Sequence, residues 1–290
     1  MMWMIVAALV VLLILAAVFL STPAEPSYRG RPLTYWLAGY DVGFAPRTDA
    51  EVPSLSEAEV AIRAIGTNAI PNLLRRLQHH HEGFSYWQFS RKRTFPFFRF
   101  ARASAISSEF EAIAGFRTLG ADAGPAVPLL LEVYNRTSDL RTRSYVLVAL
   151  ANIGPSAEPA TPLLLHTLVS TNFLWRECAA HALGEIHANA PVVVPALIPG
   201  LRDPEDKVRA ASVEALAEFG TAAKSAMPEL LALLRDPKRS AVPAFKMLPG
   251  VVADIPTIAE MATNALRDID SDAPAHVRIK DDPGLLFIPP

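Results

Sequence analysis

The feature that most constrains this chain is a pattern that recurs about every 33 residues from residue 120 onward. Prolines, arginines and residues suited to ending a helix all keep this spacing. The prolines are Pro128, Pro162, Pro195 and Pro228, and the arginines are Arg143, Arg176 and Arg209. At the same distance before each proline stands Gly120, Gly154, His187 or Gly220. A fixed period of this length is typical of a repeat architecture.

Each repeat reads as a pair of helices. In the stretch DPEDKVRAASVEALAEFG, Asp203 is the predicted N-cap and Pro204 the first helical residue, and Gly220 ends the run. Apolar and small residues recur between them at steps of three and four, as on one face of a helix: Val208, Ser212, Ala215, Leu216 and Phe219. One such stripe cannot form a core alone. Stacked pairs can, so the predicted fold class is all-α, an α-solenoid.

These residues also carry a family resemblance. The string LRDPEDKVRAASVEALAEFG (201–220) resembles a HEAT repeat, and AIRAIGTNAIPNLLRRL (61–77) is similar to an early repeat with a shortened turn. RGRPLTYWLAGY (29–40) resembles the entry segment of bacterial membrane-anchored HEAT-repeat proteins. The resemblance covers about residues 55–270. It implies a right-handed superhelix whose second helices line a concave face that holds other proteins.

The resemblance further implies a buried ladder between a turn aspartate and an arginine on the following helix. Asp203 and Arg209 match this pattern. Arg143 and Arg176 keep the arginine, but Thr137 and Ser170 stand where the aspartate would be. The expected ladder is therefore incomplete, and its arginines are expected to act through stability.

The first twenty residues, MMWMIVAALVVLLILAAVFL, contain no charged side chain. As a helix they would extend about 30 Å, the thickness of a bilayer's hydrocarbon core. They predict a single-pass membrane anchor over residues 1–22, with the rest of the chain on the extracytoplasmic side. A cleaved signal peptide is the alternative. Residues 23–54 then form a linker and entry segment, residues 55–270 the solenoid, and residues 271–290 a tail.

An insertion interrupts the early repeats. Gly66 and Gly120 are separated by more than one and a half periods, and the surplus over one period falls in residues 80–103. Its stretch FSYWQFSRKRTFPFFRF (84–100) has eight aromatic and four cationic side chains and no carboxylate. Trp87 and Phe98 are expected to be mainly core. Three cations are expected to be exposed and to meet an acidic partner or anionic lipid: Arg91, Lys92 and Arg93. Binding of single-stranded nucleic acid is the weaker alternative.

Composition and motifs argue against several functions. The formal charge of −2 gives no global case for nucleic acid, and Cys178, the only cysteine, allows no intramolecular disulfide or multi-thiolate zinc site. Consecutive His79, His80 and His81 point about 100° apart on a helix and cannot converge on one metal ion without ligands from elsewhere in the chain. No Gly-rich phosphate loop or G-x-S-x-G elbow is present. We therefore expect no enzymatic activity, no cofactor and no metal.

The predicted function is that of a membrane-tethered scaffold that binds a protein or peptide partner through its concave face. His181 and Glu214 lie one repeat period apart and should be neighbours on successive second helices. Tyr145 stands in the same relation to Cys178. Tyr145, His181 and Glu214 are thus candidate partner contacts, together with the three insertion cations. The alternatives are a HEAT-like enzyme of the lyase or glycosylase type, or a membrane-surface module that binds through the insertion.

Overall fold

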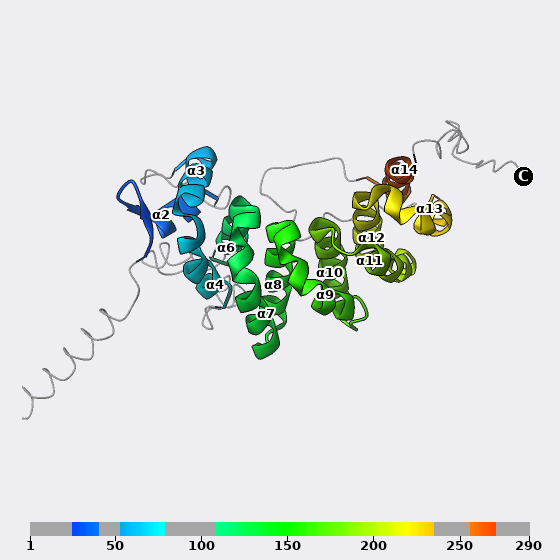
Figure 1. The fold of residues 1–290 in the computed structure, drawn as a ribbon, viewed down its shortest axis with the longest axis horizontal. Coiled ribbons are helices and arrows are strands. Elements are labelled where there is room, and N and C mark those ends of the chain that lie inside the picture. The colour runs from blue at the N-terminus through cyan, green and yellow to red at the C-terminus, as the bar shows by residue number, and fades with distance from the viewer. Residues whose placement is uncertain (1–24, 41–52, 79–107, 235–255, 271–290) are drawn as a thin grey trace, which may run out of the picture.

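The computed structural model describes residues 25–40, 53–78, 108–234 and 256–270 (Figure 1). All structural statements below concern these ranges. The insertion at 80–103, with Trp87, Arg91, Lys92, Arg93 and Phe98, lies outside them, as do the predicted anchor and the tail.

The described helices form two rows. The first helices of the pairs are α4 (Ile70–Gln78), α7 (Val127–Arg136), α9 (Thr161–Thr167), α11 (Ala190–Leu197) and α13 (Met227–Leu233). The second helices are α6 (Ser108–Leu119), α8 (Leu140–Ile153), α10 (Phe173–Ile186), α12 (Asp206–Glu218) and α14 (Ile258–Ile269). Each of α6, α8, α10 and α12 packs against the next second helix. The rows follow a shallow bend with the second helices on its inner side (Figure 1). This confirms the stacked all-α architecture, whereas the right-handed superhelix stays a prediction.

The N-terminal elements close one end of the stack. Strands β1 (Ser27–Tyr28) and β2 (Arg31–Pro32) form an antiparallel hairpin that leads into α2 (Leu33–Leu37) and the 3-10 turn η1 (Ala38–Tyr40). Helix α2 packs on α3 (Leu55–Ile65), and Leu33 and Leu37 are fully buried. The Tyr40 hydroxyl hydrogen-bonds the hydroxyl of Thr118 on α6. The entry segment is therefore part of the core, although the predicted boundary at residue 54 stays a prediction.

Tight turns precede four of the described first helices, α4, α7, α9 and α13. They are 3-10 segments: η2 (Gly66–Ala69), η4 (Gly120–Ala126), η5 (Gly154–Ala160) and η7 (Gly220–Ala226), and a further one, η6 (Ile198–Arg202), prolongs α11. Gly120, Gly154 and Gly220 have positive φ, as the sequence predicted. His187 reaches a φ of 54° without being glycine, and its ring stacks on Phe219 at 4.6 Å. This stacking offsets part of the cost of the left-handed backbone.

The start of α12 differs from the prediction. The helix begins at Asp206 with Glu205 as its N-cap residue, later than the predicted start at Asp203 and Pro204. Asp203 instead orders the preceding turn, because its carboxylate accepts the N–H of Glu205 and also binds an arginine of the previous repeat. A carboxylate held in this way cannot cap the helix. Pro195 also differs from the other repeat prolines, since it lies inside α11 rather than in its first turn.

The arginine ladder runs between repeats, which corrects the prediction for Arg176. Its Nε and Nη2 atoms donate to the two carboxylate oxygens of Asp203 at 2.7 and 2.8 Å, and Nη1 donates to the Ser170 carbonyl at 2.9 Å. Arg209 donates to the main-chain carbonyl of Asp203, not to its carboxylate. Both partners of the ion pair are mostly buried, with side chains 14% and 11% exposed. The pair thus joins two successive repeats.

Arg143 is held by aromatic rings instead. Its Nε donates to the Thr137 carbonyl at 3.0 Å, and its guanidinium carbon lies 5.3 Å from the ring centroids of both Tyr134 and Trp175. The turn position that would supply its carboxylate is Ser170, one period before Asp203. A cation between two rings recovers part of the missing attraction.

No helix within the described ranges is long and apolar enough to span a bilayer. The longest, α8 and α10, have 14 residues, which corresponds to about 21 Å at 1.5 Å per residue, against about 30 Å of hydrocarbon. The predicted single-pass anchor and membrane localisation are therefore corrected: this finding does not support them. Residues 1–22, on which they were based, lie outside the described residues.

We predict that Arg176→Ala lowers the free energy of unfolding by about 2–4 kcal/mol, because it leaves the mostly buried Asp203 carboxylate without its charged partner. Arg136→Ala is the matched control. It removes an ion pair with Glu132 whose side chains are 80% and 47% exposed, and such pairs contribute about 0–1 kcal/mol. Chemical denaturation of both variants measures the difference, and equal losses would contradict a structural role for the ladder.

We also predict that Gly184→Ala destabilises the chain by about 1–3 kcal/mol, although alanine favours helices, because the added Cβ would lie 2.8 Å from the Ala215 Cα. Helices α10 and α12 would have to move apart. Gly115→Ala is the comparison, since the atoms nearest to its added Cβ belong to the Leu73 side chain and not to a helix backbone. Thermal unfolding should give Gly184→Ala a clearly lower midpoint temperature than Gly115→Ala. A Gly184 variant as stable as the parent would show that the two helices can separate freely.

Candidate docking groove

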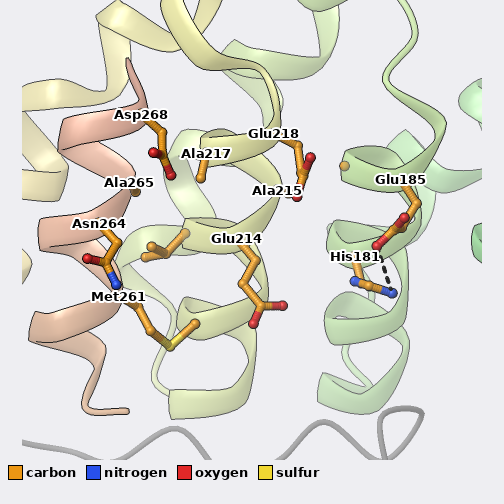
Figure 2. Close-up of a pocket in the computed structure, with 12 residues that line it drawn as sticks. His181, Glu185, Glu214, Ala215, Ala217, Glu218, Met261, Asn264, Ala265 and Asp268 are labelled. Carbon is orange, nitrogen blue, oxygen red and sulfur yellow. Dashed lines mark ion pairs between the residues drawn. The ribbon is translucent and has the colours of Figure 1, made fainter. Parts of the chain in front are cut away.

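A groove with a cavity of about 290 Å³ crosses three neighbouring second helices (Figure 2). Helix α10 contributes three residues, α12 five and α14 four. They are His181, Gly184 and Glu185; Val213, Glu214, Ala215, Ala217 and Glu218; and Met261, Asn264, Ala265 and Asp268. The groove lies on the row of helices that faces the inner side of the bend in Figure 1.

The repeat spacing explains how these residues meet. His181 and Glu214 occupy the same position in successive repeats, as do Glu185 and Glu218, since the members of each pair are one repeat period apart. Gly184 lets α10 approach the backbone of α12 closely. Small and apolar residues form the floor, with Val213 and Ala265 each 1% exposed and Met261 8% exposed. The polar side chains stand along its walls (Figure 2).

Several carboxylates belong to the described part of the groove lining. Among the described residues, the lining holds the carboxylates of Glu185, Glu214, Glu218 and Asp268 and no Lys or Arg. The His181 side chain is 11% exposed, and its Nε2 lies 3.7 Å from Oε1 of Glu185. Carboxylates gathered along a concavity focus a negative potential.

The structure brings together two of the predicted site residues. His181 and Glu214 line the groove, but Tyr145 does not. Tyr145 lies half-buried on α8 with its ring centroid 6.3 Å from that of Phe110, and burial together with the nearby Glu109 carboxylate raises the pKa of its hydroxyl. Arg91, Lys92 and Arg93 lie outside the described residues. That any of these six contacts a partner stays a prediction.

Sequence reasoning missed Glu185, Glu218, Asn264 and Asp268. The same repeat register that selected His181 and Glu214 could have selected Glu185 and Glu218. No such signal was available for α14, because the distance along the chain from Asp206 to Ile258, where the two helices begin, is far more than one period. The place of α14 beside α12 comes only from the structure.

Two further features of the described residues concern metal ligands and the single cysteine. Within these ranges, no three His, Cys, Asp or Glu side chains are grouped so that they could hold a metal ion. Cys178 is buried, and burial together with the neighbouring Glu177 carboxylate raises the pKa of its thiol. A thiol that stays protonated is a poor nucleophile.

A second cavity of about 540 Å³ lies between α4, α7 and α8, lined in part by Leu74, Leu129 and Glu132.

Comparisons with known proteins identify the repeats. A family model described as HEAT repeats matches residues 127–217, and one described as PBS lyase HEAT-like repeat matches residues 208–236. Neither match reaches residues 29–40, so the resemblance of that segment to bacterial membrane-anchored proteins stays a prediction. No curated protein matches the chain.

Two solved structures are among those similar to this chain. One is an engineered protein, 19% identical, with a TM-score of 0.45 over 81% of this chain and 96% of the other. The other is Kap121p, 13% identical, with a TM-score of 0.47 over 82% of this chain. The matched part is 25% of Kap121p. The paired helices, the recurring arginines and the two family matches together lead to one conclusion: residues 127–236 of this chain are HEAT repeats.

Proposed function

We propose that this protein is a scaffold that binds a protein or peptide segment in the groove across α10, α12 and α14. One observation carries this proposal: the groove is continuous over three successive second helices, so its lining belongs to several repeats at once. Stacked repeats create extended surfaces of this kind, and such surfaces commonly bind other proteins. HEAT repeats are helical scaffolds, which supports the same function.

The dimensions of the groove also favour a chain segment. Its cavity of about 290 Å³ lies at the lower limit of small-molecule pockets, which usually measure about 300–1,000 Å³ and enclose most of their ligand. The groove instead runs past the exposed side chains of Glu218, Asn264 and Asp268. A peptide can lie along such a surface and contact each helix in turn.

The groove is built on rigid elements. Neighbouring second helices pack through buried residues, and Ala182, Leu216 and Ala262 are each fully buried. A preformed surface loses little conformational entropy when a partner binds. Less of the binding free energy is therefore lost to ordering the site, and the affinity is higher. The enzymatic alternatives of the lyase or glycosylase type have no comparable observation in their favour.

The test uses a random library of 12-residue peptides selected against the full chain. A photo-crosslinking phenylalanine analogue replaces Asn264 in the groove in one variant and Val192 on the outer helix α11 in another; Val192 is 47% exposed. We predict saturable binding of a selected peptide and crosslinking from position 264 but not from position 192. Mass spectrometry of the crosslinked products locates the contact.

Two results would contradict the proposal. The first is crosslinking from position 192 alone, which would place the docking surface on the outer helices. The second is a selection that yields no peptide with saturable binding. Circular dichroism of both variants serves as the control that the helices are intact.

A further inference from the structure

The ladder of recurring arginines has one member that lacks an ionic partner. Arg176 pairs with the carboxylate of Asp203, whereas the turn residue that corresponds to Asp203 for Arg143 is Ser170. No carboxylate of the described residues forms an ion pair with Arg143. Asp139, four residues before it, serves as the N-cap of α8, where its carboxylate accepts a main-chain N–H.

Ser170 and Asp203 correspond in local structure as well as in sequence. The Ser170 hydroxyl accepts the N–H of Asn172 at 3.2 Å, and the Asp203 carboxylate accepts the N–H of Glu205 at 3.0 Å. In both turns the donor lies two residues after the acceptor. The two turns therefore form the same hydrogen bond and differ in the carboxylate. The turn beside Arg143 has the conformation of a ladder turn without its anion.

The guanidinium group of Arg143 is held in place and still has donors to offer. Its Nε donates to the Thr137 carbonyl, and its carbon lies 5.3 Å from the ring centroids of Tyr134 and Trp175. Trp175 is itself fixed, because its Nε1 donates to the Leu140 carbonyl at 3.3 Å. Among the described residues, Nη1 and Nη2 of Arg143 have no hydrogen-bond acceptor. A pair of parallel N–H groups of this kind binds both oxygens of a carboxylate.

Apolar side chains are exposed in the two turns that flank this arginine. Leu140 and Phe173 begin α8 and α10, and Val169 lies in the turn before α10; they are 56%, 41% and 81% exposed. One period later, in the turn of the complete ion pair, Asp206 corresponds to Phe173 and Arg202 to Val169. The exposed apolar residues therefore occur where the ladder lacks its carboxylate, and charged residues replace them where it has one.

These features together select a partner class by charge and by apolar contact. A carboxylate would supply the anion that Arg143 lacks, and apolar side chains beside it would cover the exposed ones. A cationic partner would be repelled, and a neutral one would leave the half-buried guanidinium without an anion. Arginine, tryptophan and tyrosine are also the residues that contribute most to protein interfaces. Because the two rings already position the guanidinium, little conformational entropy is lost on binding.

We propose that the α7–α8 and α9–α10 turns form a second docking site, where Arg143 binds the carboxylate of a partner protein's aspartate or glutamate that is flanked by apolar residues. The partner's carboxylate pairs with Arg143 as Asp203 pairs with Arg176 within the chain. Neither Arg143 nor the exposed residues beside it line the groove across α10, α12 and α14. The inference therefore goes beyond the proposed function and concerns a separate surface.

The experiment titrates the full chain, labelled with ¹⁵N at tryptophan, with synthetic peptides that are blocked at both ends. The probe is Ala-Leu-Asp-Leu-Ala, and the control carries asparagine in place of aspartate, which keeps the shape and removes the charge. A third peptide carries phosphoserine at that position. The indole N–H signal of Trp175, assigned with Trp175→Phe, reports on the site. We expect a saturable shift with the probe and binding of the asparagine peptide that is weaker by at least about 10-fold.

Variants of the chain assign the effect to Arg143. Arg143→Gln should weaken binding of the probe by at least about 10-fold. Arg141→Gln is the matched control, because it makes the same charge change at an exposed position two residues away, and it should change binding by no more than about 2-fold.

Ser170→Asp supplies the carboxylate from the chain itself. Aspartate can keep the hydrogen bond that Ser170 makes, as Asp203 shows in the next turn. We expect this variant to unfold at a higher midpoint temperature than the parent and to bind the probe at least about 10-fold more weakly, because Arg143 is then paired within the chain. It tests the site even if Arg143→Gln fails to fold.

Four results would overturn the inference. They are the absence of saturable binding of the probe, equal binding of the aspartate and asparagine peptides, and equal binding of the probe to the parent and to Ser170→Asp. The fourth is a phosphoserine peptide that binds more than about 10-fold more tightly than the probe, which would make the ligand a phosphate. A parent dimer that Arg143→Gln dissociates would show that a second copy supplies the carboxylate, and the partner assignment would be wrong. None of these results bears on the groove, which is tested by crosslinking from position 264.

Discussion

The structure depends on the packing of each second helix against the next. A single helix pair buries too little apolar surface to be stable alone, so each pair requires its neighbours. The contact of α10 with α12 is close, since Gly184 leaves no room for even a methyl group beside Ala215. This close approach also creates the groove, because three helices held side by side present their inner faces as one surface. Stability and the candidate function thus have the same physical origin.

The Arg176–Asp203 ion pair joins two successive repeats. Arg176 binds the carboxylate of Asp203 in the following turn and a carbonyl of its own turn, so it ties two repeats together. Arg143 also contacts two repeats, because it lies near the rings of Tyr134 on α7 and Trp175 on α10. An ion pair and a cation–π contact therefore serve the same purpose at equivalent positions, each adapted to the residue that the next turn supplies.

The regular repeat period made the stacked fold and the turn glycines predictable from sequence. The period alone does not reveal that Arg176 pairs with Asp203. That contact crosses from one repeat to the next, whereas the family pattern places the aspartate and its arginine in the same repeat. Tyr145 does not line this groove, and its equivalents one and two periods on, Cys178 and Ala211, are 3% and 1% exposed, so those positions face neighbouring helices. The α14 side of the groove was hidden, because residues 235–255 break the period and the tertiary contact of α14 with α12 leaves no spacing signal.

The most direct test of the central claim, that the groove across α10, α12 and α14 is the docking surface, is a methyl NMR titration. Alanine methyl groups report on both rows of helices in the full chain. With a peptide selected for binding, we predict that the methyl chemical shifts of Ala217 and Ala265 in the groove change. Those of Ala157 and Ala160 in the η5 turn should stay the same. Shifts that cluster around the second cavity, beside Leu74 and Leu129, with Ala217 and Ala265 unchanged, would contradict it.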